Sequence, residues 1–170
     1  MFEAATEIVS QLMHQPVFSV GAGASVEEAM ALAHDKAIHH IPIMQAGKLL
    51  GLVCVCDLNE ARPDVRVLQL ARRNVITAPP DCSALDAARL MMTHAVGSVV
   101  ICNRDGVWGI VTRQDLSQAD AELAALLADS VCATCGAREH LRLGPSDTFL
   151  CAECAARAST CHWYDDGCGD

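Results

Sequence analysis

The feature of this sequence that most restricts its fold is an internal repeat: residues 9–62 recur 58 positions later without a gap. Identical residues stand at helix starts, at apolar positions and in a closing motif. They include the pairs Ser25 and Ser83, Ala29 and Ala87, Gly51 and Gly109, Val53 and Val111, and Asp57 and Asp115. A repeat of this length predicts two similar structural units in one chain.

Each copy has the pattern strand, helix, strand, strand, helix. In the first copy, residues 17–20 predict a short strand, and Ser25-Val26-Glu27-Glu28 is a capping box that starts a helix. Residues 38–44 and 49–55 predict two strands, and a second helix begins at Asp57. The predicted fold class is therefore α+β.

The second copy repeats this order, and its flanks are helical. Asn103-Arg104-Asp105-Gly106 between two apolar runs predicts a hairpin. An amphipathic helix over residues 2–12 precedes the first copy, and one helix over residues 116–131 follows the second.

The closing motif of the second copy is Gly109-Ile110-Val111-Thr112-Arg113-Gln114-Asp115. A carboxylate can accept hydrogen bonds from two vicinal ribose hydroxyls, and a threonine hydroxyl three residues earlier can donate to a phosphate oxygen. This chemistry assigns Asp115 to a ribose and Thr112 to a phosphate. The alternative is structural, because Thr112-x-x-Asp115 is also a capping box, and Asp57 or Asp115 could simply cap a helix.

Two tandem copies closing on this motif resemble the cystathionine-β-synthase-type (CBS) domain pair over about residues 8 to 120. The resemblance rests on Ser25 and Ser83, on Ile38-His39-His40-Ile41-Pro42-Ile43 and on the two closing motifs. It implies two repeats related by a pseudo-twofold axis, with clefts that bind adenine nucleotides or related adenosyl ligands. Such modules usually regulate and do not catalyse. The first copy departs from the family pattern, because Cys54 stands where a serine or threonine is usual.

The resemblance also extends the predicted site beyond Thr112 and Asp115. The base would lie against Thr77, Ala78 and Pro79 and against Ser98, Val99 and Val100. In members that bind phosphorylated adenosines, basic side chains at the place of His39 and His40 reach the phosphates. Arg113 is a further candidate phosphate ligand, and Asp57 is the matching ribose candidate of the first copy. The structural alternative is that the histidines alternate on a strand and that Arg113 is solvated.

Six of the ten cysteines fall in the last forty residues. Cys132-Ala133-Thr134-Cys135 and Cys151-Ala152-Glu153-Cys154 are two Cys-x-x-Cys pairs whose four thiolates suit tetrahedral Zn²⁺. The segment resembles a zinc ribbon, and so short a segment needs metal to fold. Rubredoxin-type iron and a redox dithiol are the chemical alternatives. Cys161, His162 and Cys168 are additional soft ligands without an assigned role.

The net charge of −9 and the pI near 5.1 argue against broad nucleic-acid or anionic-membrane binding. No basic leader or apolar run of membrane-spanning length is present in the sequence, which predicts a cytoplasmic protein. No nucleophile with a positioned base is apparent, so the sequence predicts a protein that is not an enzyme.

The predicted organisation has five parts: residues 1–62 with the first repeat, 63–120 with the second, a linker helix at 121–131, a zinc ribbon at 132–158 and a flexible tail at 159–170. The predicted function is an adenine-nucleotide sensor, as a homodimer, whose zinc ribbon contacts a protein partner. The alternatives are a zinc-ribbon adaptor on a CBS scaffold that binds no ligand, and an iron or dithiol redox protein.

Overall fold

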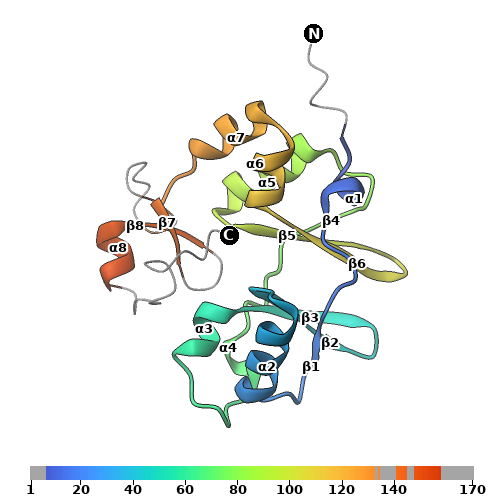
Figure 1. Cartoon of the computed structure of the whole chain (residues 1–170), viewed down its shortest axis with the longest axis vertical. Helices are drawn as coiled ribbons and strands as arrows, with labels where there is room; N and C mark the ends of the chain where they lie inside the picture. The colour runs from blue at the N-terminus through green and yellow to red at the C-terminus, as the bar shows by residue number, and fades with distance from the viewer. Residues whose placement is uncertain (1–6, 133, 135–140, 145–147, 158–170) are drawn as a thin grey trace. The chain divides into compact units, whose positions relative to one another are not determined.

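The computed structural model describes residues 7–132, 134, 141–144 and 148–157 (Figure 1). They belong to two units. Of the described residues, one unit comprises 7–17, 76–132, 134, 141–143 and 148–156, and the other comprises 18–75, 144 and 157. The segment that precedes the first copy therefore folds with the second copy.

The unit that holds the first copy is built on a three-stranded sheet. The strands are β1 (Val20–Gly21), β2 (His40–Gln45) and β3 (Lys48–Cys54), in the order β1-β2-β3. Strand β1 is parallel to β2, and β2 is antiparallel to β3. The helices are α2 (Val26–Lys36), α3 (Val55–Asn59) and α4 (Val67–Leu70).

Local sequence explains where α2 begins and ends. The Ser25 hydroxyl accepts a hydrogen bond from the Glu28 amide, and the Glu28 carboxylate accepts one from the Ser25 amide at 2.7 Å. The predicted capping box is therefore formed. Ala37 ends the helix in the left-handed conformation, with φ of 51°. Alanines 29 and 33 pack against Ile41, Ile43 and Val53 of the sheet, because their small side chains allow close approach.

The second copy forms the same fold. Its sheet has strands β4 (Thr77–Ala78), β5 (Ser98–Asn103) and β6 (Gly106–Thr112), in the order β4-β5-β6. The helices of this unit are α1 (Val9–Leu12), α5 (Ala84–His94), α6 (Arg113–Ala119) and α7 (Ala121–Ala128). In Figure 1, α5, α6 and α7 lie on one side of this sheet.

The two sheets match residue for residue. His40 lies opposite Cys54 in the first sheet, and Ser98 lies opposite Thr112 in the second. Each sheet has one irregularity, after Ile43 and after its repeat partner Ile101. The internal repeat predicted from sequence is therefore a structural repeat.

A crossing backbone segment lies close to the glycine of each closing motif. His14 donates its amide hydrogen to the Ile110 carbonyl at 2.9 Å, and Arg72 donates to the Leu52 carbonyl at 2.9 Å. A Cβ atom on Gly109 would lie 2.5 Å from the Met13 sulfur and 3.0 Å from the His14 carbonyl oxygen. Glycine is required at position 109 because Met13 and His14 of the crossing segment occupy the space that a side chain would need.

Some predicted elements differ in length. Residues 2–6 of the predicted first helix lie outside the described residues, and the described helix α1 is Val9–Leu12. The predicted strand 17–20 is reduced to Val20–Gly21, and α3 begins at Val55, ahead of the predicted Asp57.

The single helix predicted over residues 116–131 is wrong. It is broken at Asp120, which has an extended backbone and ends α6 while it caps α7. The Asp120 carboxylate accepts hydrogen bonds from the amides of Glu122 at 2.7 Å and Leu123 at 3.0 Å. Aspartate favours this capped conformation over a helix interior because its side chain competes for backbone amides.

The C-terminal segment contributes β7 (Leu141–Gly144), β8 (Thr148–Cys151) and α8 (Ala152–Arg157). Strands β7 and β8 form a two-stranded sheet, and β8 ends at Cys151 of the second predicted cysteine pair. The predicted tail at 159–170 lies outside the described residues.

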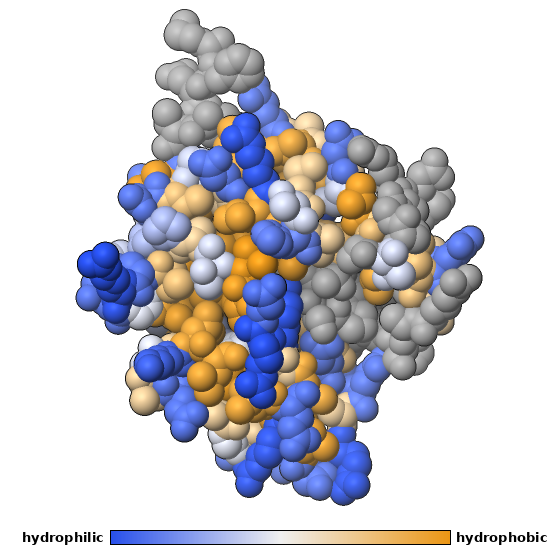
Figure 2. All heavy atoms as spheres, turned by 180° about the vertical axis from the view of Figure 1, so that it is seen from behind, coloured by the Kyte–Doolittle hydropathy of each residue, from blue (hydrophilic) through white to orange (hydrophobic). Residues whose placement is uncertain are grey.

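The surface combines apolar and hydrophilic side chains on the face drawn in Figure 2. Among the described residues, Trp108 is the one exposed large hydrophobic residue, at 42%. Within the same residues, no helix has the length and apolar character needed to cross a membrane.

Candidate functional site

The sheet β4-β5-β6 brings together several of the predicted ligand contacts. Thr77 lies opposite Val100, and Ser98 lies opposite Thr112. Because side chains alternate along a strand, these four residues lie on one face of the sheet. Ser98 and Val100 are completely buried, whereas Thr77 is exposed.

The opposite face of this sheet belongs to the hydrophobic core. Ala78 and Val99, which sequence also assigned to the base, pack there with Ile101, Val111 and helix α5. Pro79 follows β4 and is exposed. The predicted base contacts are therefore divided between the two faces.

Thr112 and Asp115 form a complete capping box at the start of α6. The Asp115 Oδ2 atom accepts from the Thr112 amide and from the Thr112 hydroxyl, each at 2.7 Å. The Thr112 hydroxyl oxygen accepts from the Asp115 amide at 3.3 Å. One carboxylate oxygen is therefore used to hold the helix start, and the other is left for a different partner.

That other oxygen contacts His14, a residue that the sequence interpretation missed. His14 Nε2 lies 2.7 Å from Asp115 Oδ1, and the His14 side chain is 73% exposed while that of Asp115 is 13% exposed. An exposed imidazole can rotate away at little cost, because ion pairs at the surface contribute about 0–1 kcal/mol. The repeat contained a signal for this position, since the residue 58 positions after His14 is the basic residue Arg72.

Arg113 is held by α7, by the segment that follows it and by β8. Its guanidinium donates to the Ser130 hydroxyl at 2.8 Å and to the Leu127 carbonyl, and it lies 4.3 Å from the centre of the Phe149 ring. Burial lowers the pKa of Arg113, which remains charged. Its predicted phosphate contact would require these bonds to be exchanged.

The closing motif of the first copy is weaker. The Cys54 amide donates to Asp57 Oδ2 at 3.4 Å, and the Cys54 sulfur accepts from the Cys56 amide at 3.4 Å. Hydrogen bonding with the Cys56 side chain, and then burial, raise the pKa of Cys54, so this group remains a thiol. A thiol is a poor donor compared with the Thr112 hydroxyl.

His39 and His40 lie next to this motif, in the same unit. The His39 carbonyl accepts from the Val55 amide at 2.9 Å, and His40 pairs with Cys54 across the sheet. Burial, and then the neighbouring His40, lower the pKa of His39. This histidine is therefore held mainly neutral near pH 7.

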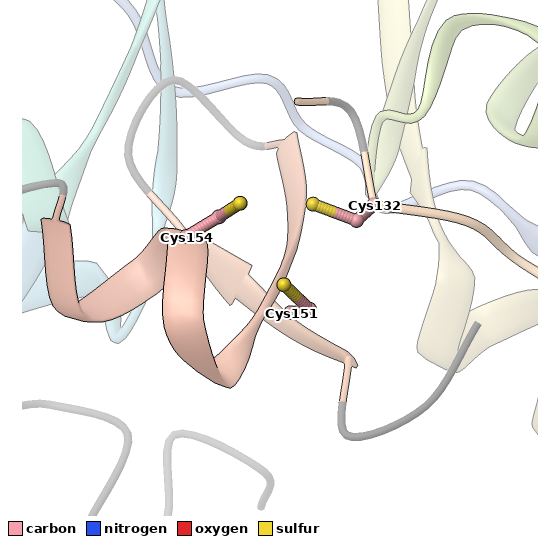
Figure 3. A group of neighbouring side chains, drawn as sticks. All are labelled: Cys132, Cys151 and Cys154. Atoms are coloured by element: carbon pink, nitrogen blue, oxygen red, sulfur yellow. The ribbon is translucent and has the colours of Figure 1, made fainter. Parts of the chain in front are cut away.

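Three of the four predicted metal ligands lie together. Cys132 follows α7, Cys151 ends β8 and Cys154 lies in α8, and Figure 3 shows their sulfur atoms converging. The three sulfur atoms lie within 4.8 Å of one another. Tetrahedral Zn²⁺ with Zn–S bonds of about 2.3 Å separates sulfur atoms by about 3.8 Å, so the three thiols fit this ion after a small adjustment. The fourth predicted ligand, Cys135, lies outside the described residues.

Comparison with known proteins identifies the repeat. The model of the CBS domain family matches residues 9–64 and 67–122. This chain belongs to the CBS domain family. The curated relatives of this CBS-pair chain include homoserine O-acetyltransferase from Methanohalobium evestigatum, 30% identical over 114 residues, 65% of this chain and 23% of the relative. Inosine-5'-monophosphate dehydrogenase from Nitrosopumilus maritimus is 25% identical over 62% of this chain and 23% of the relative. The chain thus spans about a quarter of the length of these enzymes.

Solved structures of CBS domain pairs have the same fold. The CBS domain pair of protein MJ0100, in complex with 5-methylthioadenosine and S-adenosyl-L-methionine, has a TM-score of 0.62 and 27% identity, and covers 66% of this chain and 94% of that one. The cytosolic domain of the Mg²⁺ channel MgtE, in complex with ATP, has a TM-score of 0.61 and 25% identity, with coverage of 67% and 49%. The predicted tandem CBS pair is therefore confirmed.

Proposed function

We propose that this chain is a regulatory module that binds an adenine nucleotide or a related adenosyl ligand at its second CBS copy. The observation that carries the proposal is the pair Thr112 and Asp115 at the end of β6. Two similar CBS structures are described as complexes with ATP or with adenosyl compounds, which supports the same ligand class here.

Asp115 would receive the ribose. Its Oδ2 atom already holds the start of α6, and Oδ1 faces the exposed His14 ring. A vicinal diol would displace that ring and donate to the carboxylate, and hydrogen bonds to a charged acceptor contribute about 1.5–3 kcal/mol. The Thr112 hydroxyl would turn from Oδ2 to a phosphate oxygen.

The other predicted contacts remain part of the proposal. Thr77, Ala78, Pro79, Ser98, Val99 and Val100 would supply backbone groups and small surfaces for the base. His39, His40 and Arg113 are the candidate phosphate ligands. Asp57 is the ribose candidate of a second, weaker site, because Cys54 replaces the hydroxyl at that position.

We also propose that Cys132, Cys135, Cys151 and Cys154 bind one structural Zn²⁺ in a ribbon that contacts a protein partner, with the chain acting as a homodimer. The convergence of three thiols supports the metal half of this proposal. In this proposal the module controls a partner's activity without catalysing a reaction itself, and the CBS pair supports the regulatory half.

Isothermal titration with AMP, ATP and S-adenosylmethionine tests the ligand. We expect at least one of them to bind the wild-type chain and to bind the Asp115→Asn variant at least about tenfold more weakly. The Asp105→Asn variant, altered in the hairpin of the same unit, is the control and should bind as the wild type does. No heat with any of the three would favour the ligand-free adaptor.

Native mass spectrometry of the freshly purified chain tests the metal and the assembly together. We expect one zinc per chain and a dimer mass. Stoichiometric iron with visible absorption, or a metal-free chain with a reducible disulfide, would favour the redox protein.

A further inference from the structure

The side chain of Arg113 connects the proposed ligand motif to the cysteine-bearing segment. Arg113 is the residue after Thr112, and its guanidinium donates to the Ser130 hydroxyl at 2.8 Å. The Ser130 hydroxyl in turn donates to the Leu127 carbonyl at 2.7 Å. On its other side the guanidinium lies 4.3 Å from the centre of the Phe149 ring in β8. We call Arg113, Ser130 and Phe149 the Arg113 clamp.

The backbone makes a second connection at the same place. The Phe149 amide donates to the Ala95 carbonyl at 3.0 Å, and the Arg113 amide donates to the Gly97 carbonyl at 2.8 Å. Residues 95–97 join α5 to β5, which begins with Ser98. The cysteine-bearing strand β8 and the first residue of α6 therefore hold the same short loop.

The clamp is two residues from the thiols at both ends. Ser130 precedes Cys132, and Phe149 precedes Cys151, by two positions each. All four are buried, with exposures of 3% for Ser130, 2% for Cys132, 6% for Phe149 and 7% for Cys151. An ion that joins the two cysteines would therefore fix the positions of Ser130 and Phe149 as well.

The helices and strands that carry the second pair of thiols are short. Strands β7 and β8 have four residues each, and α8 has six. Elements this short do not form a core of their own, and metal binding supplies the folding free energy of such segments. Without the ion, Phe149 would lose its fixed position over Arg113, and the start of α6 would lose one of its anchors.

We propose that a thiolate-binding divalent cation at Cys132, Cys151 and Cys154 orders the Thr112 and Asp115 motif through the Arg113 clamp and thereby raises the affinity for the adenosyl ligand. The affinity half of this inference rests on the proposed function. Ordering the site before the ligand arrives reduces the entropy lost on binding. Coupling of this kind is reciprocal, so the ligand also raises the affinity for the cation by the same factor.

Hydrogen–deuterium exchange on the full chain tests the ordering without any nucleotide. We compare the zinc-loaded chain with the chain after treatment with a chelator. We expect faster exchange without zinc at the amides of residues 112–115 and 95–98 as well as at the cysteines. Faster exchange confined to residues 132–157 would overturn the inference.

Titration with AMP tests the affinity. We expect the zinc-loaded chain to bind about five to ten times more tightly than the stripped chain, within the usual range of coupling between two sites. Equal affinities in both states would overturn the inference while leaving the proposed function intact. No binding of AMP, ATP or S-adenosylmethionine in either state, with zinc-dependent protection at residues 112–115, would refute the proposed function and support the ordering.

Clamp variants keep the test decisive if removal of zinc unfolds the chain. Phe149→Leu and Arg113→Met, both zinc-loaded, remove the ring and the guanidinium. We expect each to keep one zinc and to show faster exchange at residues 112–115. Phe149→Leu should also bind AMP severalfold more weakly, whereas Arg113→Met is compared by exchange alone, because Arg113 is itself a candidate phosphate ligand. Arg89→Met is the matched control, because Arg89 pairs with Asp86 on the exposed side of α5. A Phe149→Leu chain with wild-type protection and affinity would contradict the clamp.

Discussion

The two CBS copies have the same fold and the same sheet register, yet their closing motifs are held differently. In the second copy, the Thr112 hydroxyl both donates to the Asp115 carboxylate and accepts from the Asp115 amide. The first copy also forms a capping box, but there the Cys54 amide donates to Asp57 Oδ2 at 3.4 Å, and the Cys54 sulfur also accepts from the Cys56 amide at 3.4 Å. The comparison teaches that the aspartate carboxylate lies closer to the backbone amide of the threonine cap, at 2.7 Å, than to that of the cysteine cap, at 3.4 Å.

The side chains around the two aspartates also differ. Asp115 has an exposed imidazole on its free oxygen, and Arg113 beside it is held by the helix that follows. The first copy has two buried thiols and a partly buried histidine instead. We therefore expect the second copy to be the stronger ligand site.

The largest effect, on ligand affinity, is expected when each aspartate is replaced by asparagine. Asp115→Asn should weaken AMP binding by about 10- to 100-fold, because hydrogen bonds to a charged acceptor contribute about 1.5–3 kcal/mol. Asp57→Asn should weaken it by a smaller factor. Calorimetric titration of both variants checks this difference, and an equal loss in the two would remove the distinction between the copies.

The next effect concerns the glycines under the crossing chains. Gly109→Ala should cost about 1–3 kcal/mol of unfolding free energy, because the added carbon would lie 2.5 Å from the Met13 sulfur. Gly51→Ala should cost a similar amount, since its added carbon would lie 2.9 Å from the Ala71 Cβ atom.

A second substitution separates space from backbone effects at each glycine. Met13→Ala should recover part of the loss in Gly109→Ala, and Ala71→Gly should do the same for Gly51→Ala. Urea unfolding monitored by circular dichroism gives the unfolding free energies of the wild type, the four single variants and the two double variants. Purely additive losses in both double variants would show that crowding by the crossing chain is not the cause.

A smaller effect is expected when the capping atoms are exchanged. Thr112→Val should cost about 1 kcal/mol, because the helix start loses its side-chain cap. Cys54→Ser should gain up to about 1 kcal/mol, because a hydroxyl can both donate to Asp57 and accept from a backbone amide. Thermal unfolding of the two variants measures both signs. A Cys54→Ser chain less stable than the wild type would mean that burial of the hydroxyl outweighs the cap.

The smallest effect is a dependence of stability on pH. The pKa of His39 is lowered in the folded chain by burial and by His40, so the unfolded chain binds a proton more readily than the folded one. The preference of folded His39 for its neutral form stabilises the folded chain above the ordinary histidine pKa of 6.5. This contribution is lost as the pH falls below that value. Acidification from pH 7 to 5.5 should therefore destabilise the wild type more than His39→Gln. Urea midpoints at the two pH values check this, and equal shifts in the two chains would contradict it.

Much of the fold could be predicted because its signals are local. The Ser25 capping box, the two-strand pattern and the Thr112 and Asp115 cap involve residues at most a few positions apart. The break at Asp120 had a signal too, an aspartate with the amides of Glu122 and Leu123 in reach. Helix-favouring residues on both sides of Asp120 concealed the break, because the helical spacing of apolar residues continues from α6 into α7.

Less of the site could be predicted. The cysteine spacing was enough to expect a shared metal site, and three of the four thiols do lie together. The division of the base contacts between two sheet faces required the register of β4, β5 and β6. His14 was missed because a single exposed histidine has no pattern of its own, although the repeat places a basic residue at both positions.

The sequence by itself determined the repeat, the helix caps and the thiol pairs, since each depends on spacing along the chain and on side-chain chemistry. Only the tertiary structure decided which distant group each charged side chain meets. His14 and Asp115 are 101 positions apart, and Arg113 and Ser130 are 17 apart. Such contacts depend on how strands and helices pack, and neither local hydrogen bonds nor hydrophobic periodicity specifies that packing.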